Sequence, residues 1–159
     1  MSKTALLIMD LQTGILDRVP TASTLLPLYA TTIASARASS IPIIYIKLGF
    51  RPHHPDISPH NKIAGFSAFA STDLELVLRS LGVQGAVVAG VSTSGVVLSS
   101  VREPADRDYG VTVLRDLCFD GDEEVHRVLV EKVFPKQADV VTAGEWVAGL
   151  KGVEEVKGE

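Results

Sequence analysis

The chain has 159 residues, of which 46% are hydrophobic and 21% are charged. This is the composition of one ordinary globular domain, and it argues against collagen-like, coiled-coil and disordered chains. The net charge is −4 and no run of Lys or Arg is present, so we expect neither a nucleic acid nor an anionic membrane as a partner.

Three features of the sequence concern the compartment of the protein. The single cysteine, Cys118, cannot form an intramolecular disulfide, which favours a reducing environment. The apolar run that starts at Thr4 is interrupted by Asp10 and is too short for a signal peptide. No apolar run reaches the length of a membrane-spanning helix. These features predict a cytoplasmic protein.

Five short apolar runs without polar alternation are typical of buried parallel strands. They are Ala5–Met9, Ile41–Leu48, Ala86–Val91, Val111–Leu114 and Val140–Thr142. Longer stretches between and after them predict helices over Ser23–Ser39, Thr72–Leu81, Thr93 to about Arg107, Glu123–Phe134 and Gly144–Leu150, the last with Trp146 on its inner face. The alternation predicts a three-layer α/β fold, a doubly wound, Rossmann-like parallel sheet of about five strands. Because no repeat or linker interrupts it, we expect a single domain over residues 1–159.

One segment, Gly49–Gly65, is rich in Pro and His and has no helix or strand period, which predicts a long surface loop. Its possible metal ligands are His53, His54, Asp56 and His60. Their spacing matches no defined metal motif, so we expect a solvated loop and no metal, with metal binding as the alternative. The charged end, Lys151–Glu159, is expected to be a frayed tail.

Ligands of an open parallel sheet bind at the carboxyl ends of its strands. Asp10 directly follows the first predicted strand. A buried carboxylate is costly without a partner, which favours a site role for Asp10. The alternative is that Asp10 caps a turn or a helix start.

The third predicted strand ends in small hydroxyl residues, Ser92, Thr93 and Ser94, which lead straight into a helix. Free N–H groups at such a helix start suit an anion or an oxyanion. The segment does not match the G-x-S-x-G elbow of serine hydrolases, because Ser94 stands where the second Gly should be. The alternative is that Thr93 or Ser94 is a helix cap.

Two further residues carry reactive groups. Cys118 follows a predicted strand and has no neighbouring cation to lower the pKa of its thiol, so we expect a buried structural thiol. His126 lies among charged residues of a predicted helix, which places it at the surface.

Three segments together resemble the isochorismatase-like (cysteine hydrolase) family, which includes isochorismatases, nicotinamidases and carbamoylsarcosine amidases. They are Thr4–Gln12, similar to the family's first strand, Phe66–Leu74, similar to its S-x-F-x-x-T-x-L segment, and Gly90–Thr93, similar to its G-V-x-T turn. The resemblance implies a doubly wound sheet, a small amide or vinyl-ether substrate and a cis peptide between Val91 and Ser92. It carries the catalytic Asp onto Asp10. The residues expected to contact the substrate are Gln12, Phe66, Val91, Ser92, Thr93 and Val96.

The sequence departs from the family pattern at two of the three catalytic positions. The family's nucleophilic Cys lies three residues after the Thr of the turn, where this chain has Val96, so the covalent route is implausible. The family's Lys ends a strand shortly before the S-x-F segment, and that strand is missing here. Lys62 could replace it only if the loop folds back toward Asp10. A missing strand also leaves a sheet edge that a second copy could cover, which favours a homo-oligomer.

Three functions compete at this point. The first is a hydrolase of small molecules with a modified mechanism, in which Asp10 activates a water molecule and no cofactor takes part. The second is a pseudoenzyme that binds a small molecule or pairs with another copy. The third is a metal hydrolase built on the loop that contains His53 and His60.

Overall fold

The computed structural model describes residues 3–55, 57–62 and 67–156, with 151–156 described by their backbone alone. Five strands form one sheet in the order β2-β1-β3-β4-β5, and every neighbouring pair is parallel. The strands are β1 (Thr4–Met9), β2 (Ile43–Ile46), β3 (Gly85–Val91), β4 (Gly110–Phe119) and β5 (Asp139–Val141). The predicted α/β fold with about five parallel strands is confirmed.

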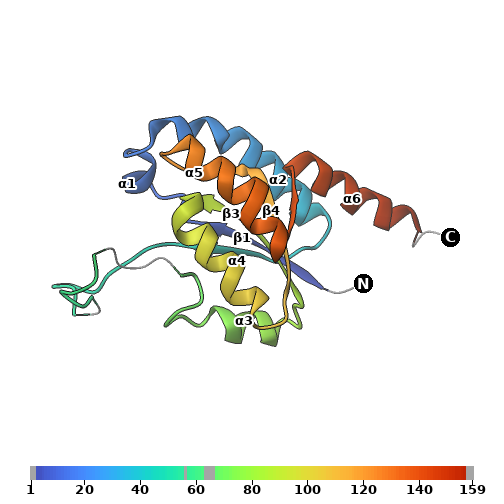
Figure 1. The fold of residues 1–159 in the computed structure, drawn as a ribbon. Helices are drawn as coiled ribbons and strands as arrows, with labels where there is room; N and C mark the ends of the chain where they lie inside the picture. Colours follow the sequence, from blue (N-terminus) through green and yellow to red (C-terminus); the bar gives the residue numbers. More distant parts are fainter. Residues whose placement is uncertain (1–2, 56, 63–66, 157–159) are drawn as a thin grey trace.

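Helices cover both faces of this sheet (Figure 1). The helical segments are α1 (Thr13–Leu16), η1 (Pro20–Leu25), α2 (Leu26–Ala38), α3 (Leu74–Ser80), η2 (Thr93–Val97), α4 (Leu98–Ala105), α5 (Glu123–Val128), η3 (Leu129–Val133), η4 (Phe134–Lys136) and α6 (Ala143–Val156). Successive residues of a strand point to opposite faces. Accordingly, Leu6 belongs to the same hydrophobic cluster as Tyr29 of α2, whereas Leu7 belongs to the cluster that contains Leu78 of α3.

The centre of the sheet is the most buried part of the molecule. Every residue of β3 is buried, and so is every residue of β1 after Thr4. Side chains buried on both faces explain why these two strands read as unbroken apolar runs. In the part of the chain that the structure describes, no helix has the length and apolar character needed to cross a membrane.

Strand β4 is longer than its apolar run predicts. The run ends at Leu114, but the strand continues to Phe119 because it bulges, so that Val113 pairs with Val88 and Cys118 pairs with Gly90. Two hydrogen bonds with residues outside β4 stabilise this bulge. The hydroxyl of Tyr29 donates to the carbonyl of Leu117, and the backbone N–H of Ala143 donates to the Asp116 carboxylate at 2.7 Å. Cys118 therefore lies within a strand and not after one.

Other element boundaries also differ from those predicted. Strand β2 ends at Ile46 rather than Leu48, and the helix predicted from Thr93 begins with a π-helical turn, η2, before α4. The expected frayed tail is wrong at its start, because α6 continues through Val156. The described parts of the predicted loop, 49–55 and 57–62, contain neither helix nor strand, and they extend away from the body of the molecule (Figure 1).

Candidate functional site

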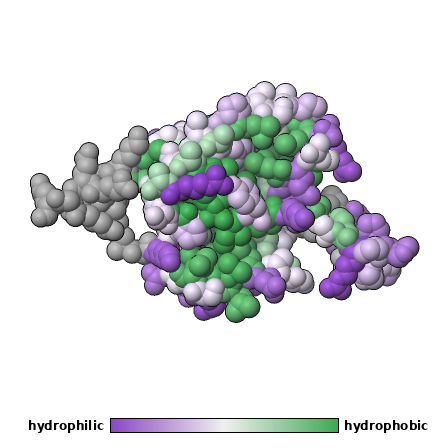
Figure 2. Space-filling view, turned by 180° about the vertical axis from the view of Figure 1, so that it is seen from behind, coloured by the Kyte–Doolittle hydropathy of each residue, from purple (hydrophilic) through white to green (hydrophobic). Residues whose placement is uncertain are grey.

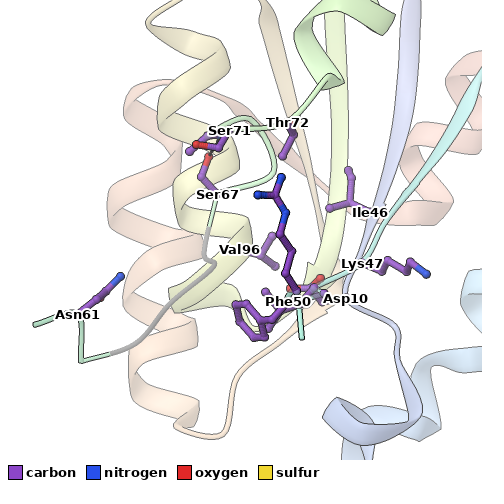
Figure 3. Close-up of a pocket in the computed structure, with 13 residues that line it drawn as sticks. Asp10, Ile46, Lys47, Phe50, Asn61, Ser67, Ser71, Thr72 and Val96 are labelled. Atoms are coloured by element: carbon purple, nitrogen blue, oxygen red, sulfur yellow. Dashed lines mark hydrogen bonds between the residues drawn. The ribbon is translucent and has the colours of Figure 1, made fainter. Parts of the chain in front are cut away.

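A cavity of about 610 Å³ opens at the carboxyl ends of β1 and β2 (Figure 3). Its lining residues are Asp10, Ile46, Lys47, Leu48, Gly49, Phe50, Arg51, Asn61, Ser67, Ala70, Ser71, Thr72 and Val96. They come from two strand ends, the segment after β2, the segment before α3 and the helix start after β3. This is the position at which parallel sheets bind ligands.

Asp10 is held at this position by the sheet. Its backbone N–H donates to the Ile46 carbonyl at 2.9 Å, which continues the pairing of β1 with β2. Its φ of 58° places it in the left-handed region, which a residue other than glycine adopts at a cost. Ser71, on the other side of the cavity lining, has the same φ of 58°. Such backbone strain is concentrated at functional sites.

Asp10 is buried, with 6% of its surface exposed. Burial raises its pKa from 3.8 to about 6, and a backbone hydrogen bond from Leu48 opposes the increase. None of the ion pairs found among the described residues includes Asp10. A carboxyl with a pKa in this range can both donate and accept a proton near neutral pH.

The alternative role of Asp10 as a helix cap is not supported by the geometry. Helix α1 has Gln12 as its N-cap residue, and no side chain caps it. The Gln12 amide instead makes two hydrogen bonds with the backbone of Leu48, donating to its carbonyl at 2.9 Å and accepting from its N–H at 2.6 Å. Gln12 therefore fixes the segment after β2 and is not among the described residues that line the cavity.

No thiol faces the cavity among the described residues. Val96 lines it and is 3% exposed, so an isopropyl group stands where the family pattern has its cysteine. Cys118 is buried in β4, and burial raises the pKa of its thiol to about 12. The predicted burial of this thiol is confirmed.

The turn after β3 meets one of the predictions made for it and differs from two others. The peptide bond between Val91 and Ser92 is cis, as the resemblance implied. The N-cap of η2 is Ser92, without a side-chain bond, so neither Thr93 nor Ser94 is the cap. Two of the N–H groups are not free either: Ser94 donates to the Asp120 carboxylate at 2.7 Å, and Gly95 donates to the Ser92 carbonyl.

The buried Thr93 hydroxyl is hydrogen-bonded to Nδ1 of His126 at 2.8 Å. The surface position predicted for His126 is therefore wrong, because its ring is half-buried against this hydroxyl. Burial lowers the pKa of His126, and the nearby Asp120 carboxylate opposes the decrease. The contact joins α5 to the start of η2, although 33 residues separate the two side chains.

The S-x-F-x-x-T-x-L segment supports the cavity with its own hydroxyls. Ser67 accepts from the N–H groups of Phe69 at 3.1 Å and Ala70 at 3.0 Å, and it donates to Glu103. The Thr72 hydroxyl donates to the carbonyl of Ala68 at 2.7 Å. Phe66, predicted to contact the substrate, lies outside the described residues.

Of the predicted site residues, the structure brings Asp10 and Val96 together at the cavity. Val91, Ser92 and Thr93 are not among the described residues that line it. Lys62 is exposed and does not line it either. No group of three or more His, Cys, Asp or Glu that could hold a metal occurs among the described residues, and Asp56 of the predicted ligand types lies outside them.

Two cations that line the cavity, Lys47 and Arg51, were missed by the sequence analysis. Because β2 ends at Ile46, Lys47 lies at a strand end next to that of Asp10, where a ligand site is expected. Its side chain extends away from Asp10 (Figure 3). Arg51 belongs to the segment interpreted as a solvated loop. Because ligands bind at the carboxyl ends of parallel strands, a correct boundary for β2 would have identified Lys47.

Sequence and structure comparisons connect this chain with known proteins. A model of the isochorismatase domain matches residues 59–145. The chain is 26% identical to the uncharacterized isochorismatase family protein YecD of Escherichia coli O157:H7, over 92% of this chain and 96% of that one. The 180 aligned positions exceed the 159 residues of the chain, so at least 21 positions of that relative have no counterpart here.

One further relative matches only part of the chain, and one solved structure shares its fold. A segment of 85 residues, 54% of this chain and 40% of the relative, is 31% identical to a maleamate amidohydrolase of Pseudomonas putida. The structure of an isochorismatase-like hydrolase from Alkaliphilus metalliredigens superposes with a TM-score of 0.78 at 23% identity, over 93% of this chain and 99% of that one.

Proposed function

The chain belongs to the isochorismatase family, and from this premise we propose that it hydrolyses a small amide or vinyl-ether substrate in the Asp10 cavity, without a cysteine nucleophile or a cofactor. The observation that carries the proposal is the Asp10 carboxyl, buried at a cavity of about 610 Å³ with a pKa of about 6. The likeness of half the chain to a maleamate amidohydrolase supports an amide as the substrate.

For an amide, the ionised Asp10 takes a proton from water while the water oxygen attacks the carbonyl carbon. The protonated Asp10 then returns this proton to the leaving amine as the C–N bond breaks. The carboxylate is regenerated, and no covalent enzyme intermediate forms. General acid–base catalysis of this kind contributes about 10²–10⁴-fold in rate.

For a vinyl ether, the protonated Asp10 donates its proton to the terminal vinyl carbon, and water adds to the resulting cation. The adduct loses its alcohol, and the proton released by the added water returns to Asp10. This route needs an acid and no nucleophilic side chain, which suits a site with Val96 at the cysteine position. The same carboxyl serves both routes because its pKa lies near 6.

The remaining site residues have supporting roles in this proposal. Val96 forms an apolar wall beside the reacting group. Gln12 acts through Leu48 by fixing the segment that leads to Arg51. Val91, Ser92 and Thr93 shape the turn that presents Val96, and the contact of Phe66 with substrate stays a prediction. Residues 1–159 act as one domain.

The test is hydrolysis of a panel of small amides, ureides and isochorismate by the purified chain and two variants. Asp10→Ala should abolish turnover. Asp17→Ala, which removes an exposed carboxylate a few residues farther along the chain, should leave it unchanged. Cooperative thermal unfolding of all three proteins establishes that they are folded. Turnover that survives in Asp10→Ala would contradict the proposal.

A second function, binding of a small molecule without turnover, is favoured by Val96, because the family's nucleophile is absent. In that case members of the same panel should raise the melting temperature of the wild type, but not of Asp10→Ala, while no product forms. Product formation by the wild type would exclude this second function.

A homo-oligomer stays a prediction, and the sheet edge supports it. β2 is an edge strand in which Tyr45 is 58% exposed, and nearby α3 exposes Leu76 at 69%. Seen from behind, hydrophobic residues gather across the centre and lower part of this face (Figure 2). Such an edge is prone to pairing with another chain. Sedimentation as a monomer at high concentration would contradict it. The cytoplasmic location also stays a prediction.

A further inference from the structure

The two edges of the sheet differ in charge and exposure. β2 and β5 are the edge strands, since each pairs with one neighbour only. β5 begins with the exposed carboxylate of Asp139, and a charge on an edge strand opposes pairing with another chain. The four residues of β2 carry no charge, and none of them is buried. β2 is therefore the edge that is open to a further strand.

The backbone groups of β2 alternate between the sheet and the solvent. The N–H of Asp10 donates to the Ile46 carbonyl at 2.9 Å, so the backbone of Ile46 faces β1. In a parallel pair, every second residue of a strand bonds to the same neighbour. With the observed register, the backbone of Ile44 therefore also faces β1, whereas Ile43 and Tyr45 point theirs away from the sheet.

The same alternation continues past the end of β2. Both backbone groups of Leu48 face inward, because they bond with the Gln12 side chain at 2.9 and 2.6 Å. Lys47, one residue earlier, therefore points its backbone outward. Within the described parts of the chain, the outward N–H groups of Ile43, Tyr45 and Lys47 make no hydrogen bond. They form a set of three with Tyr45 in the middle.

From this symmetry we infer that β2 pairs with β2 of a second copy of the chain, antiparallel and with Tyr45 on the two-fold axis. Two five-stranded sheets thereby join into one. Facing residues of an antiparallel pair exchange both of their backbone hydrogen bonds. Tyr45 exchanges two with the partner's Tyr45, and Ile43 exchanges two with the partner's Lys47. The inference rests on the homo-oligomer proposed above and specifies its interface.

The side chains of β2 fit this register. Ile44 and Ile46 point to the face covered by α3, where both are only partly buried against the core. Ile44 lies opposite the partner's Ile46 in a pair without hydrogen bonds, in which side chains approach most closely. Each of these isoleucines is thereby covered by another. The Tyr45 ring lies toward α2 on the other face, because its hydroxyl accepts from Arg37 at 3.2 Å.

Charge favours the antiparallel orientation. Lys47, directly after β2, is the one charged residue of the paired segment. A parallel pair in register would place two lysines side by side, which is destabilising. In the antiparallel pair the two lysines lie four residues apart along the strands, about 13 Å, where salt screens their repulsion. A second copy is favoured over a foreign strand because the same residues satisfy both sides of the pair.

Sedimentation velocity over a range of protein concentrations, with variants of Tyr45, tests the inference. The wild type should sediment as a dimer. Tyr45→Pro removes the N–H at the two-fold axis, and an edge strand tolerates proline where that N–H faces solvent. It should weaken the dimer about tenfold or more. Tyr45→Lys leaves the backbone intact, places like charges at the axis and should also weaken it.

Two controls separate this interface from others. Tyr45→Thr keeps the N–H and a β-branched side chain, so the dimer should persist within a few-fold of its wild-type affinity. Leu76→Lys adds a charge at a residue of α3 that is 69% exposed and takes no part in the strand pairing. It should leave the dimer unchanged.

Amide hydrogen exchange tests the register itself. In the wild-type dimer the N–H groups of Ile43 and Tyr45 should exchange slowly, as those of Ile44 and Ile46 do within one copy. In Tyr45→Lys, Ile43 should lose its protection while Ile44 keeps it.

The possible failures are distinguishable. A wild type that stays monomeric at high concentration, as when the edge receives a strand of another protein, would overturn both the homo-oligomer and this inference. A dimer that survives Tyr45→Pro and Tyr45→Lys, or one that is lost in Leu76→Lys, would overturn the inference and leave the homo-oligomer standing. None of these results depends on whether the cavity hydrolyses a substrate.

Discussion

The two sides of the cavity differ in how they are built. The strand side contributes Asp10 and Val96, which are 6% and 3% exposed and follow the two central strands. The loop side contributes residues 47–51 and 67–72, which lie outside the strands and helices. Burial shifts the pKa of a carboxyl, whereas a charge that only attracts a ligand can stay in water. In the proposed function, the reacting carboxyl therefore lies on the strand side.

The largest difference between the two sides should appear in stability. Leu7→Ala removes a fully buried side chain of β1 and should cost about 2–5 kcal/mol of unfolding free energy. Phe50→Ala, at a residue 39% exposed on the loop side, should change it by no more than about 0.5 kcal/mol. Urea denaturation of both variants measures the effect. Similar losses in the two variants would mean that the loop side is part of the core.

The second prediction concerns the cost of ionising Asp10 on the strand side. Its pKa rises from 3.8 to about 6 on folding, so the folded state holds the proton more tightly than the unfolded state. Stability should therefore fall as the pH rises through this interval, by at most about 3 kcal/mol. Below the lower value both states are protonated and the cost disappears.

Asp10→Asn removes the charge and keeps the size of the side chain. The variant should be more stable than the wild type above pH 6, by up to about 3 kcal/mol, and the difference should shrink in acid. Chemical denaturation at several pH values checks this. A difference that does not vary with pH would show that ionisation of Asp10 is not its cause.

A smaller loss of stability than that of Leu7→Ala is expected at Ser67, which anchors the loop side. Ser67→Ala leaves the N–H groups of Phe69 and Ala70 without their acceptor and should cost about 1 kcal/mol of unfolding free energy. Ser80→Ala is the control, because that hydroxyl is exposed and donates only to the carbonyl of Val77 in its own helix. Equal effects of the two substitutions in thermal unfolding would remove the anchoring role.

The sequence predicted the strand side better than the loop side, for a physical reason. β1 and β3 are buried on both faces, so their apolar runs mark them almost to the residue. Asp10 was found because strand ends bind ligands. The second half of β4 was missed because Arg115 and Asp116 interrupt its apolar run, and because its bulge is held by Tyr29, 88 residues away in sequence from Leu117.

The cations of the loop side could not be read from local patterns. Arg51 lies among prolines and histidines that are typical of a solvated loop, and its place at the cavity depends on the bond between Gln12 and Leu48 across 36 residues. The contact between Thr93 and His126 is similarly distant in sequence. Local periodicity carries no information on contacts of this kind.

The proposed reaction depends on Asp10 as the acceptor of a proton from water, without a thiol. The measurement that decides this is the pH dependence of kcat/KM for an amide substrate. We expect kcat/KM to fall in acid with an apparent pKa of about 6, to be constant above it, and to show the same pH profile in Cys118→Ala. A pH profile without this inflection, or activity lost in Cys118→Ala while the protein stays folded, would show that Asp10 does not have this role.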